Sequence, residues 1–206
     1  YFSLSKYRVF SGRIYSSMSE LLKLFEVSIW GSKINVDNDS LSKHILYLEE
    51  TQQSDEGITW GWKSGTLVDT IPCVTSLHTA IQTEIDKYAK QLALPQMRIS
   101  SSWANVNNFK DFNMLHEHPG SVLSGVYYVN ATIDQGPINF INPADKMSYC
   151  GFHHRLSYNH LNSEQWHLNS QTGTLYIFPA YLRHYVSPNS RRDSKRISVS
   201  FNTVYA

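Results

Sequence analysis

The amino-acid sequence predicts an α+β fold in which helices come first and a β-rich core follows. Apolar residues between positions 74 and 92 recur every three or four residues, the spacing of one helix face, and Pro95 ends this pattern. After Pro95 the sequence changes to short runs rich in Val, Ile, Tyr and Phe, separated by Gly, Pro and Asn. The 206 residues contain no internal repeat and no linker of low complexity. We therefore expect one domain over 1–206, with a mainly helical part over 1–95 and a β-rich core over 96–206.

Three helices are expected before Pro95. The first follows a capping box at 17–20, where a hydroxyl and a carboxylate stand three residues apart, and continues over apolar residues to Ile29. The second spans about 41–50, and the third is the periodic segment 74–92. Several glycines between 51 and 70 indicate a loop. The strands expected after Pro95 are 97–103, 122–130, 137–141, 173–178, 183–187 and 196–204. Helices followed by strands predict helices packed on one sheet of a sandwich or barrel.

Composition excludes several classes of protein. Apolar residues make up 41% of the chain, which excludes intrinsic disorder. Eighteen Lys and Arg against 17 Asp and Glu give a net charge of +1, so we expect neither a nucleic-acid-binding surface nor a membrane anchor. No apolar stretch approaches the ~18 residues that span a bilayer, and the first ten residues do not resemble a signal peptide. Cys73 and Cys150 make no disulfide framework, so we expect buried thiols and a cytoplasmic protein.

The last predicted strand has two different faces. Since strand side chains alternate, Ile197, Val199 and Phe201 share one face. The opposite face carries polar residues, namely Arg196, Ser198, Ser200 and Asn202. This polar face is either a solvated outer surface or the interior of a barrel that holds an anion. Arginine suits the second interpretation because its planar guanidinium pairs with carboxylates, and a hydroxyl two residues later can add a hydrogen bond.

A His-x-His pair is the strongest sign of a metal site. His116 and His118 project to the same side of an extended chain, about 6.6 Å apart along it, so both imidazoles can reach one ion. His184, which opens a predicted strand twelve residues before Arg196, is the candidate for a third ligand. Three protein ligands leave coordination positions open, as in catalytic metal sites.

The order of four motifs resembles the Fe(II)/2-oxoglutarate-dependent oxygenases. In particular it is similar to a branch found in bacteria and phages that is distantly related to prolyl hydroxylases. The motifs occupy 116–119, 124–129, 173–184 and 196–202, and looser similarity, including the segments 61–64 and 103–105, begins near residue 57. The motifs are specific for the superfamily and carry little information about the substrate.

The resemblance implies a double-stranded β-helix, or jelly roll, with iron at its open end. It implies that His116, His118 and His184 bind Fe(II), and that Arg196, assisted by Ser198, holds the distal carboxylate of 2-oxoglutarate. O2 is the second co-substrate. Strand residues that could reach the 2-oxoglutarate pocket are Tyr127, Tyr128, Asn105 and Asn113, and we take Asn105 and Tyr128 as the candidates for cofactor binding.

One feature departs from the common pattern of the superfamily, which has Asp or Glu where this chain has His118. Since His-x-His-Pro is the usual form of the branch, we expect three histidine ligands. A neutral ligand set leaves more positive charge on iron and favours anionic 2-oxoglutarate. Two alternatives remain open. His118 could be the first ligand, with Gly120 leaving an open position, or Glu117 could bind the metal after a local twist.

The expected reaction is hydroxylation of a peptidyl or small-molecule substrate, with release of succinate and CO2. Alternatives are a three-histidine metal dioxygenase of the cupin type that does not use 2-oxoglutarate, and a jelly-roll binding module without enzymatic activity. The connection over 147–171 is a candidate substrate lid. A homodimer is possible, but no surface is identified for it.

Overall fold

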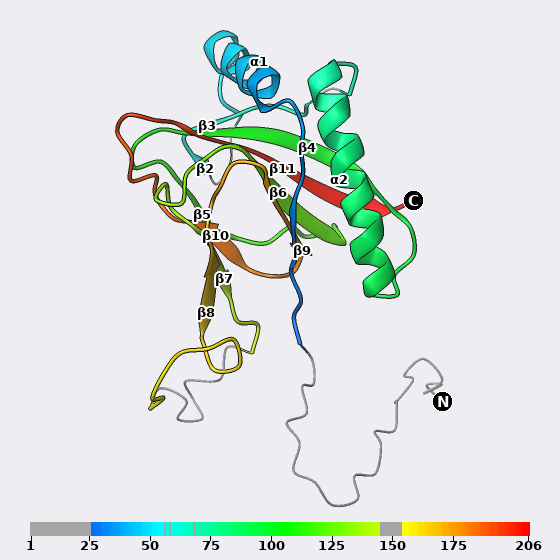
Figure 1. Ribbon diagram of the computed structural model, residues 1–206, viewed down its shortest axis with the longest axis vertical. Coiled ribbons are helices and arrows are strands. Elements are labelled where there is room, and N and C mark those ends of the chain that lie inside the picture. Colours follow the sequence, from blue (N-terminus) through cyan, green and yellow to red (C-terminus); the bar gives the residue numbers. More distant parts are fainter. Residues whose placement is uncertain (1–25, 56, 58, 68, 145–153) are drawn as a thin grey trace, which may run out of the picture.

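The computed structural model describes residues 26–55, 57, 59–67, 69–144 and 154–206 (Figure 1). The first elements in chain order are β1 (Trp30–Lys33), α1 (Asn38–Thr51), β2 (Thr59–Trp60), β3 (Trp62–Lys63), α2 (Pro72–Gln91) and β4 (Met97–Asn107). Seven strands follow, namely β5 (Phe112–His116), β6 (Leu123–Asn130), β7 (Ile138–Ile141), β8 (Gln165–Leu168), β9 (Thr174–Pro179), β10 (His184–Val186) and β11 (Arg196–Tyr205). In the described part, no helix is both long enough and apolar enough to cross a membrane.

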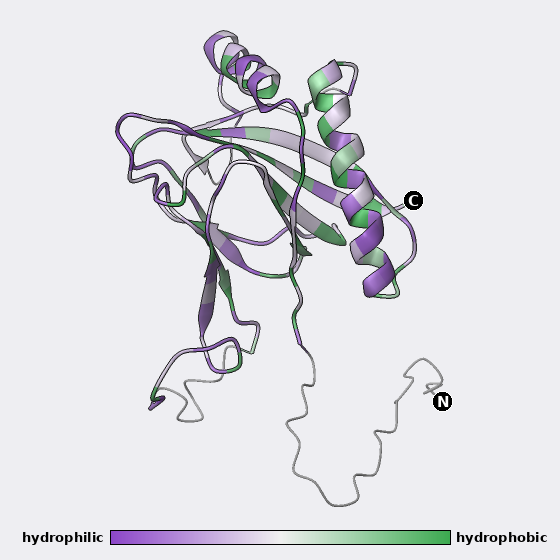
Figure 2. Ribbon diagram, viewed as in Figure 1, coloured by the Kyte–Doolittle hydropathy of each residue, from purple (hydrophilic) through white to green (hydrophobic). Residues whose placement is uncertain are grey.

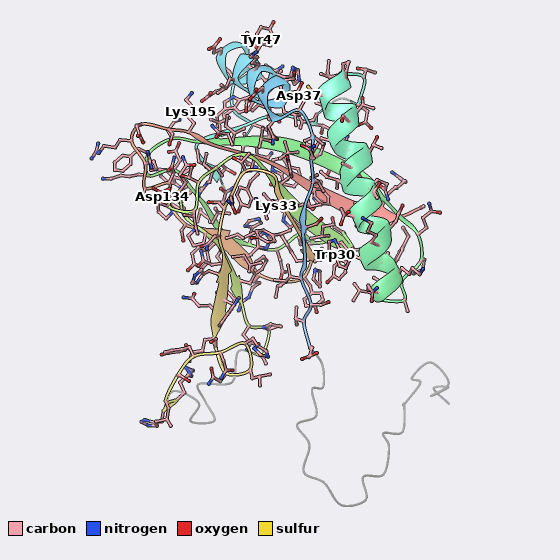
Figure 3. All side chains as sticks on the ribbon, viewed as in Figure 1. Trp30, Lys33, Asp37, Tyr47, Asp134 and Lys195 are labelled. Atoms are coloured by element: carbon pink, nitrogen blue, oxygen red, sulfur yellow. The ribbon has the colours of Figure 1, made fainter. Side chains whose placement is uncertain are left out.

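The two helices form where the sequence predicts them. The carboxylate of Asp37, at the start of α1 in Figure 3, accepts a hydrogen bond from the backbone N–H of Ser40 at 3.0 Å and so caps the helix. Helix α2 begins with Pro72, a residue well suited to the first turn, where no intrahelical partner for N–H is needed. Both helices mix hydrophobic and hydrophilic residues along their length (Figure 2), and the buried residues of α2 include the predicted face, Val74, Leu77, Ile81 and Ile85.

Two antiparallel sheets form the β-rich part of the molecule. One sheet has six strands in the order β1-β9-β6-β11-β4-β3, and the other has five in the order β2-β5-β10-β7-β8. Both helices lie on one side of the six-stranded sheet (Figure 1), where their apolar residues share a core with residues such as Val106, Tyr127 and Val199. A second cluster, which includes Val126, Phe140 and Phe178, joins the two sheets. The predicted jelly roll with helices packed on one sheet is confirmed.

Several expectations about individual elements need correction. The capping box at 17–20 lies outside the described residues, and the described end of the predicted first helix, 26–29, is not helical. Instead, Val27 and Ile29 pack against the cluster between the sheets, and the next residues form β1, which pairs with β9. The segment 51–70 contains β2 and β3, and the connection 147–171 contains β8, which pairs with β7. Residues 147–153 of the candidate lid lie outside the described residues.

Candidate metal centre and anion pocket

The three predicted histidines lie together at one end of the five-stranded sheet. His116 ends β5 and is paired with His184, the first residue of β10. His118 follows two residues after β5, where its backbone N–H donates to the carbonyl of Ala180 at 3.0 Å. Ring centroids are 4.2 Å apart for His116 and His184, 4.9 Å for His116 and His118, and 5.2 Å for His118 and His184. One ligand atom from each histidine lies within 4.8 Å of the other two, so the three imidazoles can share one metal ion.

Backbone carbonyls orient two of these rings. Nδ1 of His116 lies 2.7 Å from the carbonyl oxygen of Met114, and Nδ1 of His184 lies 2.8 Å from that of Leu182. A carbonyl oxygen only accepts, so Nδ1 carries the hydrogen in each ring. The lone pair is then on Nε2, which is the arrangement found in metal-binding histidines whose second nitrogen is held by a hydrogen bond.

The electrostatic environment keeps these imidazoles neutral. Burial lowers the pKa of His116, and burial together with the neighbouring His116 lowers the pKa of His118 to about 4. The pKa of His184 is lowered to about 3, chiefly by burial and then by its proximity to His116. All three rings are therefore unprotonated at neutral pH, which is the state required of a metal ligand.

The geometry bears on the two alternative ligand sets. Glu117 borders the cavity described below, but the group within the described residues that can share one ion consists of the three histidines alone. Gly120 offers no ligand atom, and the position two residues before His118 is occupied by His116, which is part of the same group. The local twist required for Glu117 to replace a histidine is not observed.

Arg196 lies in the same cavity as the histidines. This cavity of about 340 Å³ lies between the two sheets. Arg196 begins β11, its side chain lines the cavity, and the residue is only 1% exposed. All of its hydrogen-bond acceptors among the described residues are neutral, and burial lowers the pKa of the guanidinium. A buried cation that donates to no carboxylate among the described residues is costly, so its place in the cavity suits the binding of an anion.

The polar face of β11 is therefore an interior surface. Arg196, Ser198 and Ser200 line the cavity, whereas Ile197 and Val199 belong to the core beneath the helices. The predicted alternation of β11 is confirmed, and the barrel-interior interpretation of its polar face is correct.

Tyr128 and Asn105 also line the cavity. The hydroxyl of Tyr128 is buried and has no hydrogen-bond partner within the described part of the chain. Burial raises the pKa of Tyr128, so the hydroxyl stays protonated and can donate to an anion. The adjacent Tyr127 points to the opposite side of the sheet, where its hydroxyl donates to Oδ1 of Asn38 at 2.9 Å. Asn105 donates from Nδ2 to Oγ of Ser200 at 3.1 Å.

Three tryptophans near the site, Trp60, Trp62 and Trp103, have different environments. Trp103 lines the cavity, with its ring centroid 5.9 Å from that of His118. Trp62 is buried in the core beneath the helices, and Trp60 is exposed and stacked on Phe112. Only Trp103 is placed to contact a substrate in this cavity.

Sequence reasoning missed several residues of the site, among them Asn107, Thr59 and the loop at Gln135 and Gly136. Asn107 occurs two residues after Asn105, so the alternation of β4 places both on the cavity side. That signal was available, because 103, 105 and 107 share a face once the strand is known to extend to 107. Gln135 and Gly136 act through backbone carbonyls, which leave no sequence signature.

The donor set of the cavity fits both an iron ion and a carboxylate. Three neutral imidazoles supply ligands of the kind that iron accepts. Among the described residues, Arg196 donates to no carboxylate and the Tyr128 hydroxyl has no partner, so both can supply donors for an anion. The residues present therefore match a metal bound together with a dicarboxylate.

Comparisons with known proteins agree with this chemistry. A family model described as "Putative 2OG-Fe(II) oxygenase" matches residues 101–202, a range that contains all seven predicted site residues. A comparison with curated protein sequences finds no match.

Solved structures share the fold at low sequence identity. A prolyl-4-hydroxylase from Pseudomonas putida is 12% identical, with a TM-score of 0.64 over 87% of this chain and 94% of that chain. The epimerase SnoN, in complex with Fe3+, alpha ketoglutarate and nogalamycin RO, is 13% identical, with a TM-score of 0.59 over 87% and 80%. A Trichoplax adhaerens prolyl hydroxylase, in complex with a peptide fragment of hypoxia inducible factor, is 12% identical, with a TM-score of 0.60 over 85% and 82%. The solved structures support the fold, and the family match together with the cavity identifies a 2OG-Fe(II) oxygenase, with Fe(II), 2-oxoglutarate and O2 as its cofactors.

Proposed function

We propose that this oxygenase hydroxylates a C–H bond of a peptidyl or small-molecule substrate at the three-histidine centre. The observation that carries the proposal is the presence, in one cavity, of three converging neutral imidazoles and a buried arginine that has only neutral partners among the described residues. The imidazoles would bind a metal cation, and the arginine would bind an anionic co-substrate.

Each site residue has a proposed role. His116 and His184 would hold Fe(II) through Nε2, and His118 would hold it through one of its two ring nitrogens. Arg196 would pair with the distal carboxylate of 2-oxoglutarate, while Tyr128 and Ser198 donate hydrogen bonds to it and Asn105 lines the wall. When bound, Fe(II) supplies the oxidation in which a substrate C–H, O2 and 2-oxoglutarate become a C–OH group, succinate and CO2. The protein contributes orientation and a cavity that shields these groups from water.

The prime substrate would approach on the side of Trp103. That ring lies beside His118, and Nζ of Lys63 lies 5.8 Å from its centroid while pairing with Asp55. In the described part of the chain, this wall offers an apolar surface with one cation and no basic stripe, which favours a peptide or small molecule over a nucleic acid. The complexes of SnoN with nogalamycin RO and of the Trichoplax hydroxylase with a peptide show that this fold binds both small molecules and peptides.

A cupin-type dioxygenase without 2-oxoglutarate is the competing function. It needs the three histidines but gives Arg196 no role. The buried guanidinium, whose hydrogen-bond acceptors among the described residues are all neutral, favours a carboxylate co-substrate.

Succinate release from 2-oxoglutarate tests the proposal. We expect the Fe(II)-loaded protein to convert 2-oxoglutarate and O2 to succinate and CO2 in the presence of ascorbate, and His184→Ala to abolish both metal retention and succinate. Arg196→Ala should keep the metal but raise the half-saturating 2-oxoglutarate concentration about 10- to 100-fold, as expected for loss of charge-assisted hydrogen bonds. If the metal-loaded wild type releases no succinate while oxidising another substrate, and Arg196→Ala behaves identically, the cupin-type function is correct.

A further inference from the structure

We infer that Asn107 positions Arg196 for 2-oxoglutarate, and that the neutrality of the Asn107 amide leaves the arginine's charge available to the co-substrate. The inference rests on the proposed function and adds a positioning residue to it. Asn107 is the last residue of β4 and is paired with Arg196 across the sheet. Its Oδ1 accepts from Nε of Arg196 at 3.4 Å and from Nη2 at 3.2 Å.

Backbone carbonyls hold the other side of the guanidinium. Nη1 of Arg196 donates to the carbonyls of Gln135 at 2.5 Å, Ser187 at 2.9 Å and Gly136 at 3.1 Å. Gly136 has a φ of +88°, and a Cβ there would lie 3.0 Å from Nη1 and 2.6 Å from the carbonyl of Ser187. Only glycine allows this loop to approach so closely. The Nη1 edge is therefore committed to the protein.

The remaining edge defines where an anion can bind. Arginine has five N–H groups. Nη1 uses both of its hydrogens on carbonyls, while Nε and one hydrogen of Nη2 face Asn107, so one N–H of Nη2 has no acceptor among the described residues. Tyr128 is the neighbouring side chain whose buried hydroxyl also lacks a partner in the described part. The two donors without acceptors belong to residues of adjacent strands that line one cavity.

Asn107 is itself fixed in orientation. Its side-chain Nδ2 donates to the backbone carbonyl of Trp60 at 3.3 Å. The backbone carbonyl of Asn107 accepts from Nδ2 of Asn189 at 3.0 Å. Because a guanidinium only donates, Oδ1 of Asn107 must face Arg196. Asparagine thus supplies an acceptor without a charge. An aspartate in its place would form a buried ion pair with Arg196 and compete with the co-substrate carboxylate.

Substitution of Asn107 by its charged isostere tests the inference. The control is Asn202→Asp in β11. This variant puts the same charge on the same side of the six-stranded sheet, but about 20 Å along the strand from Arg196 and outside the cavity lining. Binding of 2-oxoglutarate is measured calorimetrically, without oxygen, on protein loaded with Fe(II), and Fe(II) affinity is measured separately. We expect Asn107→Asp to weaken 2-oxoglutarate binding at least 30-fold with Fe(II) affinity within threefold of wild type, and Asn202→Asp to match wild type within threefold.

A neutral variant separates the charge from the packing. Asn107→Ser removes the amide and shortens the side chain without adding charge, and we expect an intermediate loss of 2-oxoglutarate affinity, about 3- to 10-fold. Equal losses in the Asp and Ser variants would overturn the role of charge, and wild-type affinity in Asn107→Asp would overturn the whole inference. If Asn107→Asp does not fold, wild-type affinity in Asn107→Ser overturns the inference in its place. A metal-loaded wild type that does not bind 2-oxoglutarate would instead refute the proposed function, and the inference with it.

Discussion

Burial sets the chemical state of the individual side chains in this cavity. The same low-polarity environment lowers the pKa values of the histidines and raises that of Tyr128, so that the rings stay neutral and the phenol stays protonated. These are the states that metal ligation and hydrogen-bond donation require. The Tyr128 hydroxyl is the clearest case, because in the ligand-free protein it is removed from water and has no hydrogen-bond partner among the described residues.

Replacing Tyr128 by phenylalanine should have opposite effects on stability and on binding. Removing a buried hydroxyl that has no partner should leave the ligand-free protein as stable as wild type or more stable, by up to about 1–3 kcal/mol. The same change should weaken 2-oxoglutarate binding about 2- to 10-fold, the worth of one hydrogen bond. Urea unfolding and calorimetric titration measure the two effects. A loss of stability without a loss of affinity would contradict the assigned role.

His118→Asp would restore the carboxylate that is common in the superfamily. We expect this variant to retain Fe(II), since two histidines and a carboxylate form a standard iron site. It should weaken 2-oxoglutarate binding about tenfold or more, because a negative charge is added beside an anion in a site of low effective dielectric constant. Metal analysis and anaerobic 2-oxoglutarate titration test both points, with His118→Asn as the neutral comparison. Tighter 2-oxoglutarate binding in His118→Asp would argue against the importance of the neutral ligand set.

At the scale of elements, strand alternation explains most of the agreement between sequence and structure. The polar and apolar faces of β11 could be read from the sequence, but whether the polar face was interior depended on the partner sheet. Likewise, Tyr127 and Tyr128 are both strand residues, and only the position of the helices decides which of them faces the cavity.

The elements that escaped prediction are short or irregular. Strands β2 and β3 have two residues each, too few to establish a period. In β5 the register with β10 shifts between His184 and Val186, so alternation is interrupted just before the metal site. The apolar residues of 26–29 match a helical spacing but pack beside the sheets, where tertiary contacts override local pattern.

The packing of β6 between β9 and β11 leaves no room for a side chain at Gly125. A Cβ at this position would lie 2.3 Å from Cζ of Phe201 and 2.6 Å from the carbonyl of Tyr176. We expect Gly125→Ala to lower the free energy of unfolding by about 1–3 kcal/mol through overpacking. Gly65→Ala is the matched control, because a Cβ there would have no neighbour within 4 Å. Equal stability of the two variants in urea unfolding would show that the strands separate more easily than the structure implies.

At the scale of the whole molecule, the buried histidines make the stability of the metal-free protein depend on pH. They are neutral in the folded protein and bind protons more readily once the chain unfolds. A histidine in an unfolded chain has a pKa of about 6.5, whereas the folded values for His118 and His184 are about 4 and about 3. Between these limits the unfolded chain binds more protons than the folded protein. Stability is therefore fully present above about pH 6.5 and declines as the pH falls.

This linkage predicts the pH dependence of unfolding. We expect the free energy of unfolding of metal-free protein to fall between pH 6.5 and pH 5, by up to about 1.4 kcal/mol per pH unit for each neutral histidine. His118→Asn should reduce the slope, since it removes one of the contributing groups. Carboxylates with lowered pKa values, such as Asp37 and Asp193, add their own loss only at lower pH. A flat profile over pH 5–7 in urea unfolding would contradict the burial of the histidines.

In the proposed function, iron and 2-oxoglutarate bind together in the cavity between the sheets. The most direct test is the visible spectrum of the anaerobic Fe(II)-loaded protein during titration with 2-oxoglutarate. A weak charge-transfer band that grows to saturation is expected for wild type, with no iron retained by His184→Ala and a strongly raised midpoint for Arg196→Ala. Iron binding without any band would contradict chelation of 2-oxoglutarate, and failure to bind iron would contradict the three-histidine centre.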